Sequence, residues 1–186
     1  MLPIGPLMTE HRLIERMVCL MEKELERIKN GEGPDSGFID EAVDFFRIYA
    51  DRTHHGKEED ILFRELAKKK IQPGHDKTMQ KLINDHVQGR QMVKGLFEAN
   101  NEYAEKKDKK SLEQIKGHME ALAGFYPRHI KTEDTEFFKP VMEYFSDEEK
   151  ENMLKESNEF DRKMIHEKYK SVVEKEEKGE KCRPEK

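Results

Sequence analysis

Two ten-residue segments, 75 positions apart, carry the side chains best suited to chemistry. The segments 54–63 and 129–138 align without a gap, with a His at the first position, a Glu at the fifth and a Phe at the tenth. The same offset places His11 on His86, so each half offers one isolated His and, 43 residues later, a His-x-x-x-Glu pair. The sequence therefore contains six potential metal ligands in two matched sets: His11, His54, Glu58, His86, His129 and Glu133.

The spacing of these residues favours metal binding over a set of ordinary buried side chains. Residues four apart in an α-helix lie one above the other, with Cβ atoms about 5–6 Å apart, so each His-x-x-x-Glu pair predicts one chelating unit. The two isolated histidines lie on apolar helix stripes, where an unpaired polar group is costly to bury. A lone histidine is more often hydrogen-bonded than metal-bound, but one gapless offset relates all six residues. Imidazole with carboxylate favours iron, manganese or zinc over calcium or magnesium.

Other polar residues near these positions are weaker candidates. His55 and Glu59 also form a His-x-x-x-Glu pair, but the repeat places His55 opposite Ile130, so we expect His55 at the surface or behind the ligands. Glu15 and Tyr126 lie one helical turn from a ligand; we expect a surface acid and a packed, hydrogen-bonded tyrosine. The remaining histidines are expected to be structural or solvated: His75, His118 and His166.

The elements that must position these residues are helices with apolar positions at 3.6-residue spacing. Helices are predicted to begin near Pro6, at Ser36 as N-cap, after Gly74 and at Ser111, the last containing Pro127. They predict an all-α, up-down-up-down antiparallel four-helix bundle over residues 1–145, with repeats at about 5–70 and 76–145. The capping box 146–149 opens an additional C-terminal helical segment, 146–175, packed on the bundle. A charged, flexible tail is expected over residues 176–186.

Composition agrees with long, surface-charged helices and excludes several classes of protein. Of the 186 residues, 40% are charged and 34% hydrophobic, and the net charge of -5 gives no basic surface for nucleic acid. No apolar run reaches membrane-spanning length, and the N-terminal residues lack the features of a signal peptide. The only cysteines are Cys19 and Cys182, which exclude a disulfide framework and a Cys-ligated zinc site. A cytoplasmic location is the expectation.

Four stretches of the sequence resemble the hemerythrin-like, or HHE cation-binding, family over roughly residues 5–145. They are Thr9-Glu-His, the segment 54–63, Asp85-His and the segment 126–134. The resemblance implies a four-helix bundle around an oxo- or hydroxo-bridged, non-heme di-iron centre. The histidines 11, 54, 86 and 129 would be terminal ligands, and Glu58 and Glu133 would bridge the two irons. Manganese or zinc are possible substitutes.

The sequence departs from the oxygen-carrying hemerythrins at one position. Their third helix presents two histidines four apart, whereas here His86 is followed by Arg90. The resulting set of four His and two Glu looks most like the di-iron domain of repair-of-iron-centres proteins. It leaves an open position on each iron, which argues against reversible oxygen carriage. A ferritin-like site requires Glu-x-x-His pairs, and only Asp51-x-x-His54 comes near.

Three functions follow as hypotheses from different classes. The first is a non-heme di-iron protein that binds or reacts with O2, peroxide or NO, or handles iron under oxidative or nitrosative stress, with a possible redox protein partner. No general acid or base stands out, so enzymatic turnover is open. The alternative is a non-catalytic oxygen or iron sensor, or an O2-binding protein, with the C-terminal helix as the responsive surface. The third is a bundle with a satisfied polar core and no metal.

Overall fold

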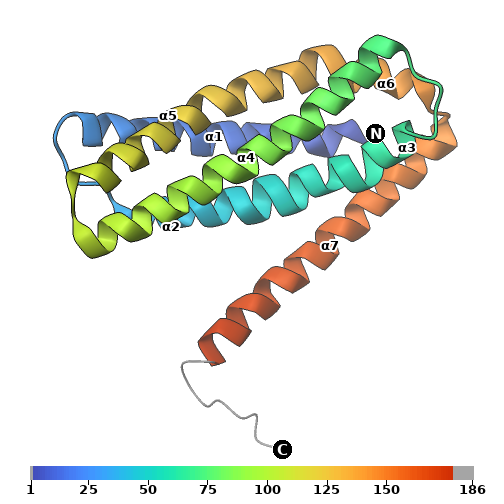
Figure 1. Cartoon of the computed structure of the whole chain (residues 1–186). Coiled ribbons are helices and arrows are strands. Elements are labelled where there is room, and N and C mark those ends of the chain that lie inside the picture. The colour runs from blue at the N-terminus through green and yellow to red at the C-terminus, as the bar shows by residue number, and fades with distance from the viewer. Residues whose placement is uncertain (1, 178–186) are drawn as a thin grey trace, which may run out of the picture.

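The computed structural model describes residues 2–177, and within them every regular element is helical (Figure 1). The first long helix is α1 (Ile4–Lys29). The second runs without interruption through α2 (Ser36–Phe45), η1 (Phe46–His55), η2 (Glu58–Phe63) and α3 (Arg64–Leu66). The third is α4 (Pro73–Lys106). The fourth combines α5 (Lys109–Thr132), η3 (Glu133–Phe137) and α6 (Phe138–Val141), followed by the 3-10 turn η4 (Met142–Tyr144) and the outer helix α7 (Asp147–Glu177).

These helices form the predicted antiparallel four-helix bundle with an additional C-terminal helix (Figure 1). The helix beginnings differ slightly from the prediction, because aspartates rather than serines supply two of the N-caps. Asp35 accepts the N–H of Phe38 at 3.0 Å, and Asp108 accepts the N–H of Ser111 at 2.8 Å, so Ser36 and Ser111 lie in first turns. Aspartate is as good an N-cap as serine, because its carboxylate accepts the free N–H groups of the first turn.

The capping box at the start of α7 is confirmed. The N–H of Ser146 donates to Glu149 Oε2 at 2.8 Å, and the N–H of Glu149 donates to Ser146 Oγ at 3.2 Å. From there α7 crosses the outside of the bundle and diverges from it toward its C-terminal end (Figure 1). Residues 176 and 177 close α7, and the rest of the expected tail lies outside the described residues.

The apolar core is divided into two parts with polar residues between them. One part contains Ile14 of α1 and Val93 of α4, and the other contains Leu7 and Leu82 of the same two helices. His11 lies between the first helix's two core positions, and His86 lies between those of α4. Helical periodicity on all four long helices therefore buries one polar layer within an otherwise apolar interior.

Within residues 2–177, none of the helices combines the length and the apolar character needed to span a bilayer.

Candidate metal centre

All four long helices contribute side chains to the buried polar layer, and each predicted ligand is at most 2% exposed. The contributors are His11 from α1, His54 from η1, Glu58 from η2, His86 from α4, His129 from α5 and Glu133 from η3. The structure thus brings together six residues that lie up to 122 positions apart in the sequence.

The donor atoms fall into two groups, in each of which they lie within 4.8 Å of one another. One group contains His11, His54, Glu58 and Glu133, and the other contains His55, Glu58, His86 and His129. Nitrogen and oxygen donors on one ion lie about 2.0–2.2 Å from it, so donors across the ion are about 4 Å apart. Each group therefore has nearly the dimensions of a single coordination sphere, and the two groups share Glu58.

Both buried glutamates reach from one group to the other. Glu58 places Oε1 at 3.5 Å from Nε2 of His54 and Oε2 at 3.3 Å from Nε2 of His86. Glu133 places Oε2 at 3.2 Å from Nε2 of His11 and Oε1 at 3.2 Å from Nε2 of His129. One oxygen of each carboxylate thus faces each group, which is the arrangement of a carboxylate that bridges two ions.

These inward-facing atoms have no hydrogen-bond partner within the described part of the chain. They are Nε2 of His11, His54, His86 and His129 and both carboxylate oxygens of Glu58 and Glu133. Leaving a buried donor or acceptor unpaired costs about 1–3 kcal/mol. Here the lone pairs converge on two common volumes instead of forming aligned pairs, so a cation in each would satisfy all of them at once.

A second layer of carboxylates orients the imidazoles, and two of these carboxylates follow the sequence repeat. Nδ1 of His54 donates to Glu10 Oε2 at 2.9 Å, and Nδ1 of His129 lies 3.5 Å from Asp85 Oδ2. The same offset that relates the two histidines relates Glu10 to Asp85. A carboxylate accepts the Nδ1 proton, which leaves the Nε2 lone pair directed inward and available to a metal.

The two isolated histidines, His11 and His86, are held in the same way. Nδ1 of His11 donates to Asp134 Oδ1 at 2.8 Å, and Nδ1 of His86 donates to Glu59 Oε1 at 2.7 Å. Asp134 and Glu59 also occupy matched positions of the repeat. None of these outer carboxylates was predicted, although each is adjacent in sequence to a predicted ligand.

The carboxylates give the centre a strong preference for positive charge. Burial lowers the pKa of His11, but the hydrogen bond to Asp134 and the nearby carboxylate of Glu133 outweigh it and raise the value to about 10. The pKa of His86 is likewise raised to about 11, against the effect of burial, by Glu133, Glu58 and Glu59. Since imidazolium and a metal ion satisfy the same negative potential, the site favours a cation over an uncharged interior.

Aromatic rings close the centre from the rest of the core. Phe138 stacks on His11 with ring centroids 5.6 Å apart, and its repeat partner Phe63 stacks on His86 at 6.0 Å. Phe125 stacks on His129 at 5.3 Å. These rings exclude water from three imidazoles, which strengthens electrostatic interactions with a bound ion.

Comparison with known families agrees with this geometry. Residues 2–141 match the family model described as Hemerythrin HHE cation binding domain, which is about three quarters of the chain. The chain belongs to this family. Neither the comparison with curated proteins nor that with solved structures found a match. Two buried His/Glu groups sharing a carboxylate are consistent with the dimetal site that is typical of hemerythrin domains.

We expected His55 at the surface or behind the ligands, and the surface placement is wrong. Its side chain is 2% exposed, its ring stacks on that of His86 with centroids 3.9 Å apart, and it belongs to the second donor group of this hemerythrin domain. Burial, and then the nearby imidazoles, hold the pKa of His55 well below its usual value, so the ring is neutral. The π-helical turn of η1 is the reason: it has more residues per turn than an α-helix, so adjacent residues 54 and 55 both face inward.

Two weaker candidates for metal ligands, Glu15 and Tyr126, lie outside the two donor groups of the hemerythrin domain. Glu15 forms an ion pair at 3.0 Å with Arg12 and is 39% exposed, as expected of a surface acid. Tyr126 is buried and stacks on Phe46 at 4.7 Å. This packing was expected, and the hydrogen bond of its hydroxyl stays a prediction.

Among the histidines whose side chains the structure describes, His75 and His118 belong to neither donor group. His75 is hydrogen-bonded to the hydroxyl of Tyr144 at 2.8 Å, and His118 is half-buried beside Gly95. The side chain of His166 lies outside the described residues. Cys19 is exposed and unpaired, and Cys182 also lies outside the described residues.

Proposed function

We propose that this hemerythrin domain holds two iron ions and binds or reacts with a small oxidant such as O2, peroxide or NO. The observation that carries the proposal is that Glu58 and Glu133 each direct one oxygen to each donor group. In a buried layer, this arrangement suits a pair of adjacent divalent ions. Mixed imidazole and carboxylate donors suit iron, with manganese or zinc as substitutes.

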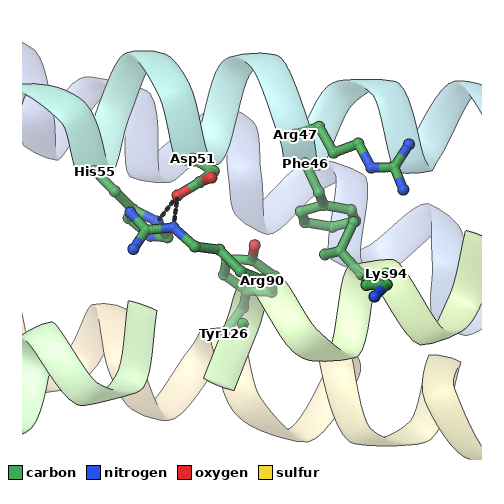
Figure 2. A pocket seen from close by; sticks show the side chains of 9 residues that line it. Phe46, Arg47, Asp51, His55, Arg90, Lys94 and Tyr126 are labelled. Atoms are coloured by element: carbon green, nitrogen blue, oxygen red, sulfur yellow. Dashed lines mark hydrogen bonds and ion pairs between the residues drawn. The ribbon is translucent and has the colours of Figure 1, made fainter. Parts of the chain in front are cut away.

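Iron in this centre would supply one-electron chemistry and coordination positions for the small molecule. The protein's own groups would fix the imidazoles through the outer carboxylates and keep water away through the stacked phenylalanines. A cavity of about 280 Å³ between η1 and α4 reaches His55 at the edge of the second donor group (Figure 2). Among the residues that line it are Phe46, His55 and Tyr126, together with the basic side chains of Arg47 and Lys94. It is large enough to admit a molecule of a few atoms.

Metal analysis and an absorption spectrum of protein produced with iron test this proposal. We expect about two iron ions per chain and absorption in the near ultraviolet that changes when O2, peroxide or NO is added to the reduced protein. The Glu58→Ala variant should lose most of the iron, whereas Glu15→Ala, at the surface, should retain it. A protein with no stoichiometric metal would contradict the proposal.

The narrower proposal, that this centre resembles that of repair-of-iron-centres proteins and handles iron under oxidative or nitrosative stress, depends on a set of four histidines. The inward position of His55 weakens that basis, since a fifth imidazole adjoins the second donor group. The same observation weakens the argument against reversible oxygen carriage, which assumed equal open positions on both irons. Anaerobic reduction followed by cycles of O2 addition and removal distinguishes the cases, because only a carrier recovers its reduced spectrum.

A sensor function has one supporting observation, the link between the centre and α7. Lys57 is 1% exposed, and its ammonium bonds both to Glu10, which holds His54, and to Asp161 of α7 at 2.7 Å. Metal binding at His54 could thus alter how α7 is held. Limited proteolysis tests this function: α7 should be cleaved faster in metal-free protein, and equal rates with and without metal would contradict it.

A further inference from the structure

The donor residues of the centre and the carboxylates behind them follow the 75-residue repeat except in one place. His55 lies in the second donor group, but its repeat partner is Ile130, which has no donor atom. Asp51, which contacts His55, is matched by Tyr126. Arg90, which contacts Asp51, is matched by Glu15. Three residues that touch one another thus depart from the repeat together, which indicates that they form one unit.

This unit is a chain of hydrogen bonds that ends on the imidazole (Figure 2). Oδ1 of Asp51 accepts Nδ1–H of His55 at 3.2 Å and Nε–H of Arg90 at 2.7 Å. Nη2 of Arg90 also donates to Glu59 at 2.8 Å. Glu59 is the carboxylate that holds His86, so one guanidinium fixes the supports of two histidines in the same donor group.

The arrangement matches that of the other four histidines in the centre. Each of them has Nδ1 on a carboxylate, as His55 has on Asp51. A ring nitrogen of His55 also lies in the donor group with Glu58, His86 and His129. An imidazole retained only for packing would need no carboxylate and guanidinium to orient it. A carboxylate on the far nitrogen is instead the usual support of a metal-ligating histidine.

We propose that His55 is a metal ligand of the second donor group, and that Asp51 and Arg90 are the residues that position it. This inference rests on the proposed dimetal function. It gives the second group three imidazoles, whereas the first group has two, His11 and His54. The two metal positions therefore differ in affinity and in coordination number, although the repeat makes the rest of the centre nearly symmetric.

Titration of the metal-free protein with Co2+ tests the inference, because the visible bands of Co2+ report its coordination. The wild-type protein should bind two ions, and His55→Ala should bind one of them with an affinity lowered by about 100-fold or more. The matched control is Ile130→Ala, which removes a buried side chain at the repeat-related position but no donor, and it should still bind two ions. Equal stoichiometry, affinity and spectra for His55→Ala and wild type would overturn the inference.

The cavity next to His55 allows a second readout that packing alone would not produce. Because His55 lines this cavity, free imidazole can enter the space left by His55→Ala. Added imidazole should restore the second Co2+ ion and its spectrum in His55→Ala, and should leave Ile130→Ala unchanged. If His55→Ala lacks the second ion and imidazole at high concentration does not restore it, the ring acts through folding and the inference is wrong.

Variants of the positioning residues keep the test open if His55→Ala folds poorly. Asp51→Asn keeps the shape of the side chain, and Arg90→Met keeps much of its length, so both should fold. Each should lower the affinity for the second Co2+ ion by about 10-fold, which is within the range known for residues behind metal ligands. Each should also alter the visible bands of that ion. Unchanged binding in both would contradict the positioning roles. A wild-type protein that fails to bind two ions would instead contradict the proposed function itself.

Discussion

Replacing Lys57 by Met tests how the outer helix is linked to the metal centre. Methionine keeps most of the buried aliphatic length of Lys57, which is 1% exposed, but removes the charge between Glu10 and Asp161. Glu10 would retain its bond to His54 at 2.9 Å and lose its second partner, and α7 would lose an ion pair to the bundle.

The magnitude follows from the burial of the three groups. Removing one partner of a fully buried ion pair costs about 3–5 kcal/mol. The side chain of Asp161 is 36% exposed and Glu10 keeps His54, so water and the imidazole offset part of the loss. We expect a loss of about 2 kcal/mol in the free energy of unfolding. For a chain of this size it corresponds to a fall of about 4–8 °C in Tm.

Thermal unfolding followed by circular dichroism, together with metal titration, measures both consequences. Lys57→Met should also weaken metal binding by up to about 10-fold, because Glu10 orients His54 less firmly. The control Asp161→Asn acts only on the α7 side, so it should lower Tm and leave metal affinity nearly unchanged. The double variant should lose less unfolding free energy than the sum of the losses in the two single variants, since both changes break one network. If Lys57→Met has the Tm and metal affinity of the wild type, the contacts of Lys57 with Glu10 and Asp161 do not stabilise the protein, and the reasoning is refuted.

Three further predictions concern charge, bridging and packing. In metal-free protein the raised pKa values of His11 and His86, about 10 and 11, mean that both rings are protonated at neutral pH, so metal binding should release protons and strengthen from about pH 6 to about pH 9. The stability that these protonated rings give the metal-free protein is complete below about pH 6.5 and is lost as pH rises through about 10 to 11, which unfolding curves would show. Glu133→Gln removes a charge shared by both groups and should lower the content of both metals by elemental analysis; loss of one ion alone would contradict a bridging role. Gly56→Ala would place Cβ 2.8 Å from the ring of Phe160, so it should loosen α7 and speed its proteolysis, whereas Gly117→Ala, with open space, should not.

The sequence by itself determined the fold and six residues of the buried polar layer. Apolar positions at helical spacing specify which face of each long helix is inside, and that face is independent of the partner it packs against. The gapless offset between His54 and His129 then placed the candidate ligands of one half on those of the other. Local patterns also sufficed for the capping box at Ser146, because its two hydrogen bonds join residues three apart.

Only the tertiary structure decided the orientation of His55 and the partners of the outer carboxylates. An α-helical period assigns residues 54 and 55 to different directions, whereas the π-helical turn of η1 brings both inward, and a single sequence carries little signal for such a turn. Glu10 accepts a hydrogen bond from His54, 44 positions away, and Arg90 of α4 donates one to Asp51 of η1. Which charged side chains meet depends on how the helices rotate and cross after packing, and adjacent candidates of similar chemistry leave that choice open until the bundle is assembled.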